Sequence, residues 1–350
     1  RNLTGRTNML RSVTLPFGGH ININYEQTTP SYDLPGRRWV MSSVEKTGGY
    51  KENGAVRSRN TFEYSGGYRD RRERDFYGFK QVRTNQIDTE NGDRLYRYSV
   101  QTYGKNRDYY THGLVTSEYL YTADGKKLQG SLYDYDLKTL AVGHNTTDAV
   151  VFPALKTLVQ SNFDEASGDS LAVAVNNTYD DYGNLQGYKE TTTSYSLEAN
   201  INYHKIADKY IVSIPSHITV SSGGKTYRER STKVDGNGEI TEIMLHNGDK
   251  PSVYNMTYDG YGNITRMTKP ENYNHQRMFY AYTYDDRYHS LVTSVKDAYG
   301  YSSSTAYDGL WNAPSVTTDL NGQKMEYTYD ALGRQQTIRA PYEIESGQPF

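Results

Sequence analysis

The stretch that decides the fold lies near the end of the chain and reads Lys324-Met325-Glu326-Tyr327-Thr328-Tyr329-Asp330-Ala331-Leu332-Gly333-Arg334. Its first half alternates, with Met325, Tyr327 and Tyr329 on one face, as a β-strand requires. Asp330 can accept hydrogen bonds from backbone amides a few residues on, and Gly333 can adopt the positive φ that reverses the chain. The stretch therefore predicts a strand, an aspartate-capped turn and the start of a return strand.

The same unit recurs along the second half of the chain. The aspartates from Asp235 onward follow one another after 24, 26, 23 and 22 residues. A period of about 20 to 50 residues is typical of a repeat architecture. The predicted structural repeat motif comprises Tyr179, Asp180 and Gly183; Asp235 and Gly238, without the tyrosine; Tyr258, Asp259 and Gly262; Tyr284 and Asp285, without the glycine; Tyr307 and Asp308, with Trp311 in place of glycine; and Tyr329, Asp330 and Gly333.

Two family resemblances follow from these residues. The Tyr-Asp-x-x-Gly series is similar to the YD repeats of RHS and teneurin-type proteins. Upstream, Tyr64-Ser65-Gly66-Gly67-Tyr68 and Arg74-Asp75-Phe76-Tyr77-Gly78-Phe79 resemble the segment of SpvB-type proteins and insecticidal toxin complex B subunits that leads into such repeats. The resemblances predict a β-rich lead-in segment over residues 1–130 and a YD-repeat β-hairpin region over residues 131–350.

An all-β fold of repeated antiparallel hairpins is expected. A single hairpin cannot bury a face alone, so the hairpins must stack on their neighbours. From the repeats themselves, either a solid solenoid or a wide curled sheet around a cavity is possible. The family resemblance implies the second, a strip of hairpins spiralling into a hollow shell. One helix is expected over residues 153–167, where Ala154, Leu155, Leu158 and Val159 have helical spacing after Pro153.

The composition restricts the possible functions. The net charge of −2 gives no basic excess and predicts no nucleic-acid partner. The chain has 36 tyrosines against 8 phenylalanines, and a ring with a polar tip suits a half-buried or wet sheet face. It lacks any apolar stretch of about 18 residues, so no membrane span is expected. Cysteine is absent, which excludes a thiol nucleophile, a disulfide and a thiolate metal site.

No catalytic, cofactor-binding or metal-binding residue is predicted. The eight histidines have no recognisable ligand spacing, and no nucleophile elbow, P-loop or dinucleotide fingerprint occurs. Asp235-Gly236-Asn237-Gly238-Glu239 has oxygen ligands at alternate positions, as a calcium loop does, but a repeat turn explains it better. Because the aspartates recur at every turn, we interpret them as caps and not as general acids.

The leading hypothesis is a non-enzymatic segment of an RHS or YD-repeat toxin-type protein, secreted or on a bacterial cell surface. The resemblance implies that it forms part of a hollow β-shell that encloses a downstream effector polypeptide. Its partners would be the rest of its own longer polypeptide, including an encapsulated C-terminal segment, and other toxin-complex or secretion components. The alternative is an extracellular carbohydrate- or surface-binding module that uses the tyrosine ladder, and an enzyme is the remaining class.

Overall fold

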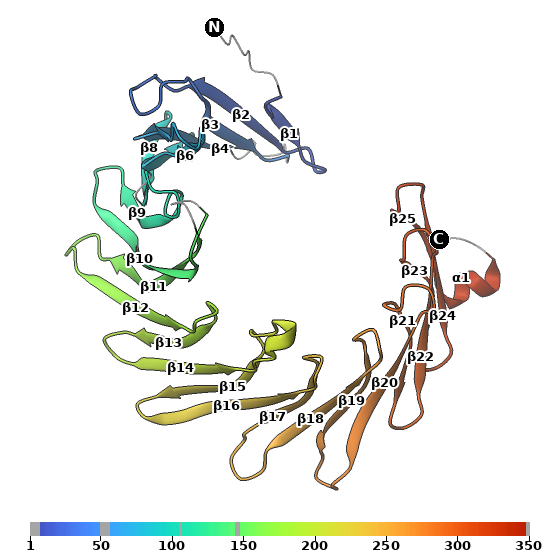
Figure 1. Ribbon diagram of the computed structural model, residues 1–350. Helices are drawn as coiled ribbons and strands as arrows, with labels where there is room; N and C mark the ends of the chain where they lie inside the picture. The colour runs from blue at the N-terminus through green and yellow to red at the C-terminus, as the bar shows by residue number, and fades with distance from the viewer. Residues whose placement is uncertain (1–7, 50–56, 105–106, 144–147, 348–350) are drawn as a thin grey trace. The chain divides into compact units, whose positions relative to one another are not determined.

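The computed structural model describes residues 8–49, 57–104, 107–143 and 148–347 (Figure 1). The chain divides into two compact units, unit 1 over Arg1–Glu198 and unit 2 over Ala199–Phe350. Antiparallel strands form nearly all the regular structure. The described exceptions are a 3₁₀ turn, η1 (Ala207–Lys209), and one short helix, α1 (Pro341–Ser346). The expected all-β fold of repeated antiparallel hairpins is confirmed.

Unit 1 is built from a meander in which each strand pairs with the next along the chain. A separate small hairpin of β5 (Tyr68–Arg69) and β6 (Phe76–Gly78) is inserted between β4 and β7. The strands of the meander are β1 (Ser12–Thr14), β2 (His20–Gln27), β3 (Trp39–Thr47), β4 (Arg57–Ser65), β7 (Gln81–Asp88), β8 (Arg94–Tyr103), β9 (Val115–Thr122), β10 (Lys127–Ala141), β11 (Val150–Phe163), β12 (Ser170–Tyr179) and β13 (Leu185–Thr191).

Unit 2 continues the same pattern after β14 (Ser196–Tyr203), which crosses the division between the units. Its strands lie side by side in chain order, so successive turns fall on opposite edges of the sheet (Figure 1). They are β15 (Pro215–Ser222), β16 (Lys225–Val234), β17 (Ile240–Leu245), β18 (Ser252–Tyr258), β19 (Ile264–Glu271), β20 (Arg277–Tyr284), β21 (Val292–Asp297), β22 (Ser302–Tyr307), β23 (Pro314–Thr318), β24 (Lys324–Tyr329) and β25 (Gln335–Arg339).

A bulge stands at the same place in every motif hairpin. The register shifts by one residue just before the capping aspartate, for example between Thr257 and Tyr258 and between Thr328 and Tyr329. A bulge bends its strand and increases the local twist. The bulge occurs once in unit 1, at Thr178/Tyr179, and its repetition in unit 2, also at Lys233/Val234, Thr283/Tyr284 and Ala306/Tyr307, bends that sheet at regular intervals.

The prediction of a helix over residues 153–167 is wrong, because most of β11 lies in this segment. Residues Val150–Phe163 pair along their length with β10. Helical spacing and buried-strand spacing overlap in so short an apolar run, and pairing with neighbours decides between them. Pro153 is tolerated because β12 pairs only with Thr157–Phe163, which leaves the start of β11 at an edge.

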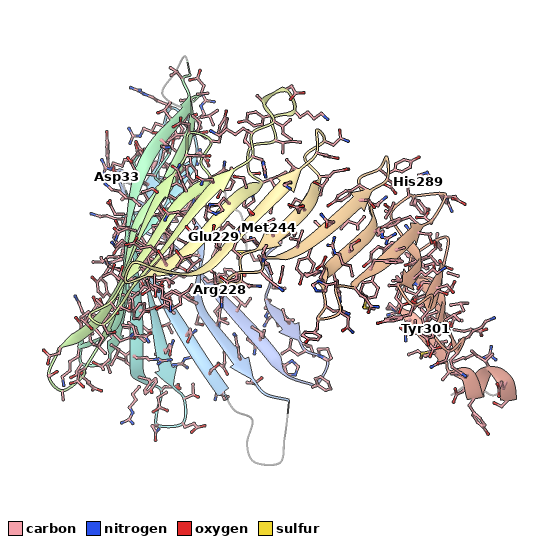
Figure 2. The ribbon with its side chains drawn as sticks, turned by 90° about the horizontal axis from the view of Figure 1, so that it is seen from below. Asp33, Arg228, Glu229, Met244, His289 and Tyr301 are labelled. Carbon is pink, nitrogen blue, oxygen red and sulfur yellow. The ribbon has the colours of Figure 1, made fainter. Side chains whose placement is uncertain are left out.

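Very few side chains are buried. Among the described residues, the buried apolar side chains are Leu34, Tyr77, Ala154, Val212 and Met256. Side chains stand on both faces of the ribbon in Figure 2. Each unit is therefore a sheet stabilised mainly by its hydrogen-bond ladder and cross-strand pairs and not by a thick core. The predicted segment boundary at 130/131 falls inside β10, and that division stays a prediction.

Candidate functional site

Each motif aspartate lies at the first position of a tight turn. In the turn between β18 and β19, Asp259 Oδ1 accepts hydrogen bonds from the backbone amides of Tyr261 and Asn263, both at 2.9 Å. The Gly262 amide donates to the Asp259 carbonyl at 3.3 Å, and Gly262 has a φ of 85°. The carboxylate thus satisfies amides that the turn leaves unpaired, and glycine supplies the left-handed conformation.

The other glycine-containing copies repeat this geometry. Asp180, Asp235 and Asp330 each accept from the amides two and four residues on, over 2.8 to 3.0 Å. Each turn also has a glycine with positive φ, at Gly183, Gly238 and Gly333. The sequence places these residues correctly in a turn, with Asp180 in unit 1 and the others in unit 2.

The two copies without the glycine form longer turns. Asp308 accepts from the amides of Leu310 and Trp311, and the positive φ moves to Asn312 at 54°. Asp285 accepts four backbone amides, from Arg287, Tyr288, Ser290 and Leu291. Here His289 has the positive φ of 53°. These turns are therefore one or two residues longer, and a residue other than glycine adopts the left-handed conformation.

The caps are held in their ionised form. Partial burial raises the pKa of Asp285, but the four amides outweigh it and lower the pKa to about 2. The Glu239 amide lowers the pKa of Asp235, and the Arg334 amide lowers the pKa of Asp330. The Asn263 side-chain amide, which donates to Asp259, lowers the pKa of that carboxylate. These shifts favour the charged form that a cap needs and not a proton donor.

The motif tyrosines connect successive hairpins through their hydroxyls. In unit 2, the tyrosine at the end of one strand donates to the carbonyl of the first residue of the preceding strand. We call this bond a tyrosine rung. The rungs are Tyr258 to Ile240 at 2.7 Å, Tyr284 to Ile264 at 2.9 Å, Tyr307 to Val292 at 2.8 Å and Tyr329 to Pro314 at 2.7 Å. In unit 1, the Tyr179 hydroxyl donates to the Leu155 carbonyl at 3.0 Å.

The ladder of motif tyrosines is therefore built from hydrogen bonds and not from stacked rings. Within the described residues, no ring-to-ring contact joins Tyr258, Tyr284, Tyr307 and Tyr329 to one another. Hydroxyl-to-carbonyl bonds connect the hairpins instead. Partial burial raises the pKa of Tyr258 and Tyr284, in keeping with rings that lie against the sheet.

Adjacent turns also touch along the motif edge. The Asn263 side chain donates to the His289 carbonyl, and the Tyr261 ring stacks on the His289 ring at 4.0 Å. Further along, Trp311 lies so close to Gly333 that a Cβ there would be 2.8 Å from the indole. The tryptophan that replaces one motif glycine thus covers the glycine of the next turn.

The opposite edge of unit 2 carries a second row of capped turns. Sequence analysis did not predict this row. Asp297 accepts from the amides of Tyr299 and Tyr301, and Asp319 from those of Asn321 and Gln323. Asn272 does the same with its amide oxygen. The signal was present as Asp-x-x-Gly at Asp297 and Asp319, without the preceding tyrosine. Figure 2 labels one residue from each edge, His289 and Tyr301.

A polar chain crosses several strands of unit 2. Lys233 in β16 bonds to Glu242 in β17 at 2.8 Å, and Asn255 in β18 donates to Glu242 at 3.3 Å. Arg277 in β20 donates to Asn255 at 2.8 Å and to the Lys269 carbonyl at 2.9 Å. The Lys233 ammonium lowers the pKa of Glu242. This region is therefore polar and connected by hydrogen bonds, as suits a surface in contact with water.

In unit 1, the second sequence signature forms one local cluster, the Tyr77 cluster, which consists of Leu34, Gly67, Tyr77, Phe79 and His112. Tyr77 is 4% exposed and stacks on His112 at 4.2 Å, and burial raises the pKa of its hydroxyl to about 12. Gly67 approaches Leu34 and Phe79 so closely that a Cβ would lie 2.8 Å and 3.0 Å from them. The β5–β6 hairpin therefore covers a small apolar centre at one side of the sheet.

Among the described residues, no group of three or more His, Cys, Asp or Glu is placed to hold a metal ion. Asp235 and Glu239 instead belong to the capped turn described above. None of the helices in the described part of the chain is long and apolar enough to span a membrane.

Comparison with known proteins finds a family match in the first part of the chain. Residues 1–109, which contain Leu34, Gly67, Tyr77 and Phe79 but not His112, match a family model described as the insecticide toxin TcdB middle/N-terminal region. The chain is similar to the B subunits of insecticidal toxin complexes. The resemblance to these B subunits inferred from the sequence is thereby confirmed. No curated protein matches.

Solved toxin-complex structures share the fold. A crystal structure of TcdB2-TccC3-Cdc42 aligns with a TM-score of 0.70 at 12% identity, covering 94% of this chain and 24% of that one. TcdB2-TccC3 without the hypervariable C-terminal region gives 0.70 at 12%, over 92% and 24%. The Photorhabdus luminescens Tc holotoxin pore gives 0.70 at 12%, over 92% and 23%. The chain thus spans about a quarter of these chains.

Proposed function

We propose that this segment is a non-enzymatic part of the wall of a toxin-complex B-type, YD-repeat shell that encloses a downstream effector polypeptide. Its partners would be the rest of its own longer polypeptide and other components of a toxin complex. The observation that carries the proposal is the repeated construction of unit 2. Every motif hairpin of unit 2 is capped at its turn, and all except the Asp235 hairpin are joined to the preceding strand by a tyrosine rung.

The thinness of each sheet supports the proposal that the segment is part of a wall. A sheet with so few buried side chains cannot be a solid core, yet its shape must persist if it is to surround another polypeptide. Caps on both edges, rungs and turn-to-turn contacts fix the hairpins relative to their neighbours without a second layer. The polar chain through Glu242 and Arg277 supplies a surface that tolerates water.

Site-specific labelling in the full-length protein tests the enclosure. The sequence has no cysteine, so one introduced thiol is a unique probe. Ser303 and Ser304 are neighbours in β22 and therefore point to opposite faces of the sheet. We would compare Ser303→Cys and Ser304→Cys for their rates of reaction with a bulky polyethylene-glycol maleimide.

A shell predicts that one of the two variants reacts at least about tenfold more slowly in the full-length protein, because one face is enclosed. Both should react rapidly in the 350-residue segment alone. Equal, rapid labelling of both positions in the full-length protein would contradict the shell. Small thiol reagents serve as the control, since they should reach both positions.

Carbohydrate binding is the second candidate, and exposed rings favour it. The motif tyrosines use their hydroxyls in rungs, whereas three strongly exposed rings lie at the turns of the opposite edge. Tyr273 is 99% exposed, Tyr299 75% and Tyr301 59%. A glycan array tests this function. Retention that is lost in Tyr299→Ala would support it, and no binding across the array would exclude it for the glycans tested.

A further inference from the structure

The β5–β6 hairpin of unit 1 borders a small basic cavity of about 220 Å³. The hairpin is inserted between β4 and β7 and forms a sheet of its own, so the repeated meander does not account for it. Four arginines against two aspartates give the lining of the cavity a formal charge of +2. These charged residues are Asp33, Arg69, Asp70, Arg71, Arg72 and Arg107.

The carboxylates of the turn between β5 and β6 already have partners. Asp70 Oδ1 accepts hydrogen bonds from the backbone amides of Arg72 and Glu73, both at 2.8 Å. Asp75 Oδ1 accepts one from the amide of Phe76 at 2.7 Å. Both carboxylates therefore cap the backbone of the turn. The alternation of acids and bases along the sequence overstates how far the arginines beside them are neutralised.

Two arginines of the cavity are held in place by uncharged groups. The Arg71 guanidinium lies over the Tyr32 ring, 4.4 Å from its centre, and Nη2 donates to the Tyr32 carbonyl at 3.1 Å. Arg69 Nη2 donates to the Arg74 carbonyl at 2.7 Å. A ring face or a carbonyl orients a guanidinium but leaves its charge in place. Since a guanidinium has five N–H donors, both arginines keep donors for a ligand.

Further cations surround the cavity. Two adjoining cavities each share a lining arginine with it, and they add Lys80 in one case and Arg37 and Arg38 in the other. An ion pair with Asp33, which is labelled in Figure 2, neutralises Arg107. This region is thus positive in a chain whose net charge is −2. A cavity lined mainly by one sign of charge raises the local concentration of ions of the other sign.

We propose that this cavity binds a sulfate or phosphate monoester group. Its volume of about 220 Å³ lies below the roughly 300 to 1,000 Å³ of pockets that enclose a drug-sized ligand, so it takes a charged group of a ligand and not the whole. Guanidinium forks match two oxygens of such a group through charge-assisted hydrogen bonds. Arg71 and Arg72 are exposed, so the rest of the ester can extend into solvent.

Arginine footprinting of the full-length protein tests the proposal. Phenylglyoxal modifies accessible arginines, and peptide mass spectrometry reports each one separately. Glucose 6-sulfate, glucose 6-phosphate and sodium sulfate are titrated in, with sodium chloride at matched ionic strength as the reference. The ester that protects at the lower concentration shows whether a sulfated or a phosphorylated ligand is preferred.

Saturable protection of the cavity is the expected result. At least one ester should slow the modification of Arg71 and Arg72 at least about fivefold, with a half-maximal effect at about 10 mM or below, as a few charge-assisted hydrogen bonds allow. Arg228, an exposed arginine of unit 2 that is labelled in Figure 2, should be modified at an unchanged rate.

A matched pair of variants locates the site. Arg72→Gln removes a charge from the cavity, and it should raise the ester concentration that half-protects Arg71 at least about fivefold. The Arg72 side chain is exposed, so the fold should tolerate the change. Arg94→Gln makes the same charge change in unit 1 at a side chain that is 71% exposed and pairs with Asp88. This control should leave the protection of Arg71 unchanged.

Four results would overturn the proposal. Equal protection by sodium chloride, equal protection of Arg228, or equal effects of the two variants would each show general charge screening. Protection by sodium sulfate without protection by either ester would show that the cavity admits only a free ion. Arg71 and Arg72 that resist phenylglyoxal without any added ester would also contradict it, because another part of the protein would then cover the cavity.

The proposed site is independent of the shell. Cysteine labelling at Ser303 and Ser304 reports enclosure by the wall, whereas footprinting reports only the arginines beside the β5–β6 hairpin. Protected labelling without ester binding would leave the wall intact and remove the anion site. Ester binding with equal labelling of both faces would retain the site on a strip that encloses nothing.

Discussion

The Tyr284 hydroxyl donates a 2.9 Å hydrogen bond to the carbonyl of Ile264, which lies at the start of the preceding strand. Tyr284 precedes the capping aspartate of its own turn, and Ile264 follows the turn of the previous motif. The bond therefore connects two repeats directly. Since four such bonds recur in unit 2, the tyrosine couples each turn to its neighbour rather than stabilising its own turn alone.

Removal of this hydroxyl should destabilise the packing of the two repeats that it joins. Tyr284→Phe keeps the ring and leaves the Ile264 carbonyl without the donor, which should destabilise unit 2 by about 1 kcal/mol. Urea unfolding followed by Trp311 fluorescence, in a Trp39→Phe background, measures the change. Tyr273→Phe is the control, because that side chain is 99% exposed. Equal midpoints for the two variants would contradict the role of the rung.

The two glycines of one turn should respond differently to alanine. Gly262 has a φ of 85°, whereas a Cβ at Gly260 would meet nothing within 4 Å and its φ is not left-handed. Gly262→Ala should cost about 1 to 2 kcal/mol, because a Cβ in the left-handed region meets the following carbonyl. Gly260→Ala should be close to neutral. Urea unfolding of the two variants checks this, and a larger cost at Gly260 would refute the turn geometry.

Low pH should destabilise the turn that Asp285 caps, over a defined pH range. The folded-state pKa is about 2, below the ordinary value of 3.8. The carboxylate therefore contributes stability above about pH 4, and that contribution is lost as the pH falls towards 2. Asp285→Asn keeps an acceptor oxygen, as at Asn272, but removes the titration. The decline of the unfolding midpoint below pH 4 should be shallower in this variant.

The neighbouring aspartate provides the control for that measurement. Asp286→Asn makes the same charge change in the same turn, but the amides of the turn bond to Asp285. Its pH profile should follow that of the unsubstituted chain. If Asp286→Asn flattened the profile as much as Asp285→Asn, net charge and not the cap would control acid stability.

The Tyr77 cluster should be the most sensitive apolar site of unit 1. Tyr77 is 4% exposed, so Tyr77→Ala should cost about 3 kcal/mol. Tyr32→Ala changes a ring that is 81% exposed and should cost less than about 1 kcal/mol. Urea unfolding followed by Trp39 fluorescence in a Trp311→Phe background compares them. Similar costs would mean that the β5–β6 hairpin does not stabilise unit 1.

Sequence analysis predicted the features that depend on short-range chemistry. Asp259 and Gly262 identify a capped turn because the hydrogen bonds span only four residues. Alternation in Tyr327-Thr328-Tyr329 identifies a strand for the same reason. The likeness to toxin-complex B subunits also rested on local motifs, such as Phe76-Tyr77-Gly78-Phe79, that lie within the matched residues 1–109.

Features that depend on neighbouring strands could not be predicted in this way. The acceptor of the Tyr284 hydroxyl lies 20 residues away and depends on the register between strands. The bulge moves that register by one residue, and nothing local shows which carbonyl it presents. Pro153 is typical of a helix start in the sequence alone, and its tolerance in β11 depends on where β12 stops pairing. The short helix α1 was also missed.

Electron cryomicroscopy of the full-length protein tests the central claim most directly. The account predicts a closed wall one sheet thick, with the strands of both units in that wall and density for enclosed polypeptide inside. A solid rod without a lumen, or a strip with solvent on both faces, would contradict it.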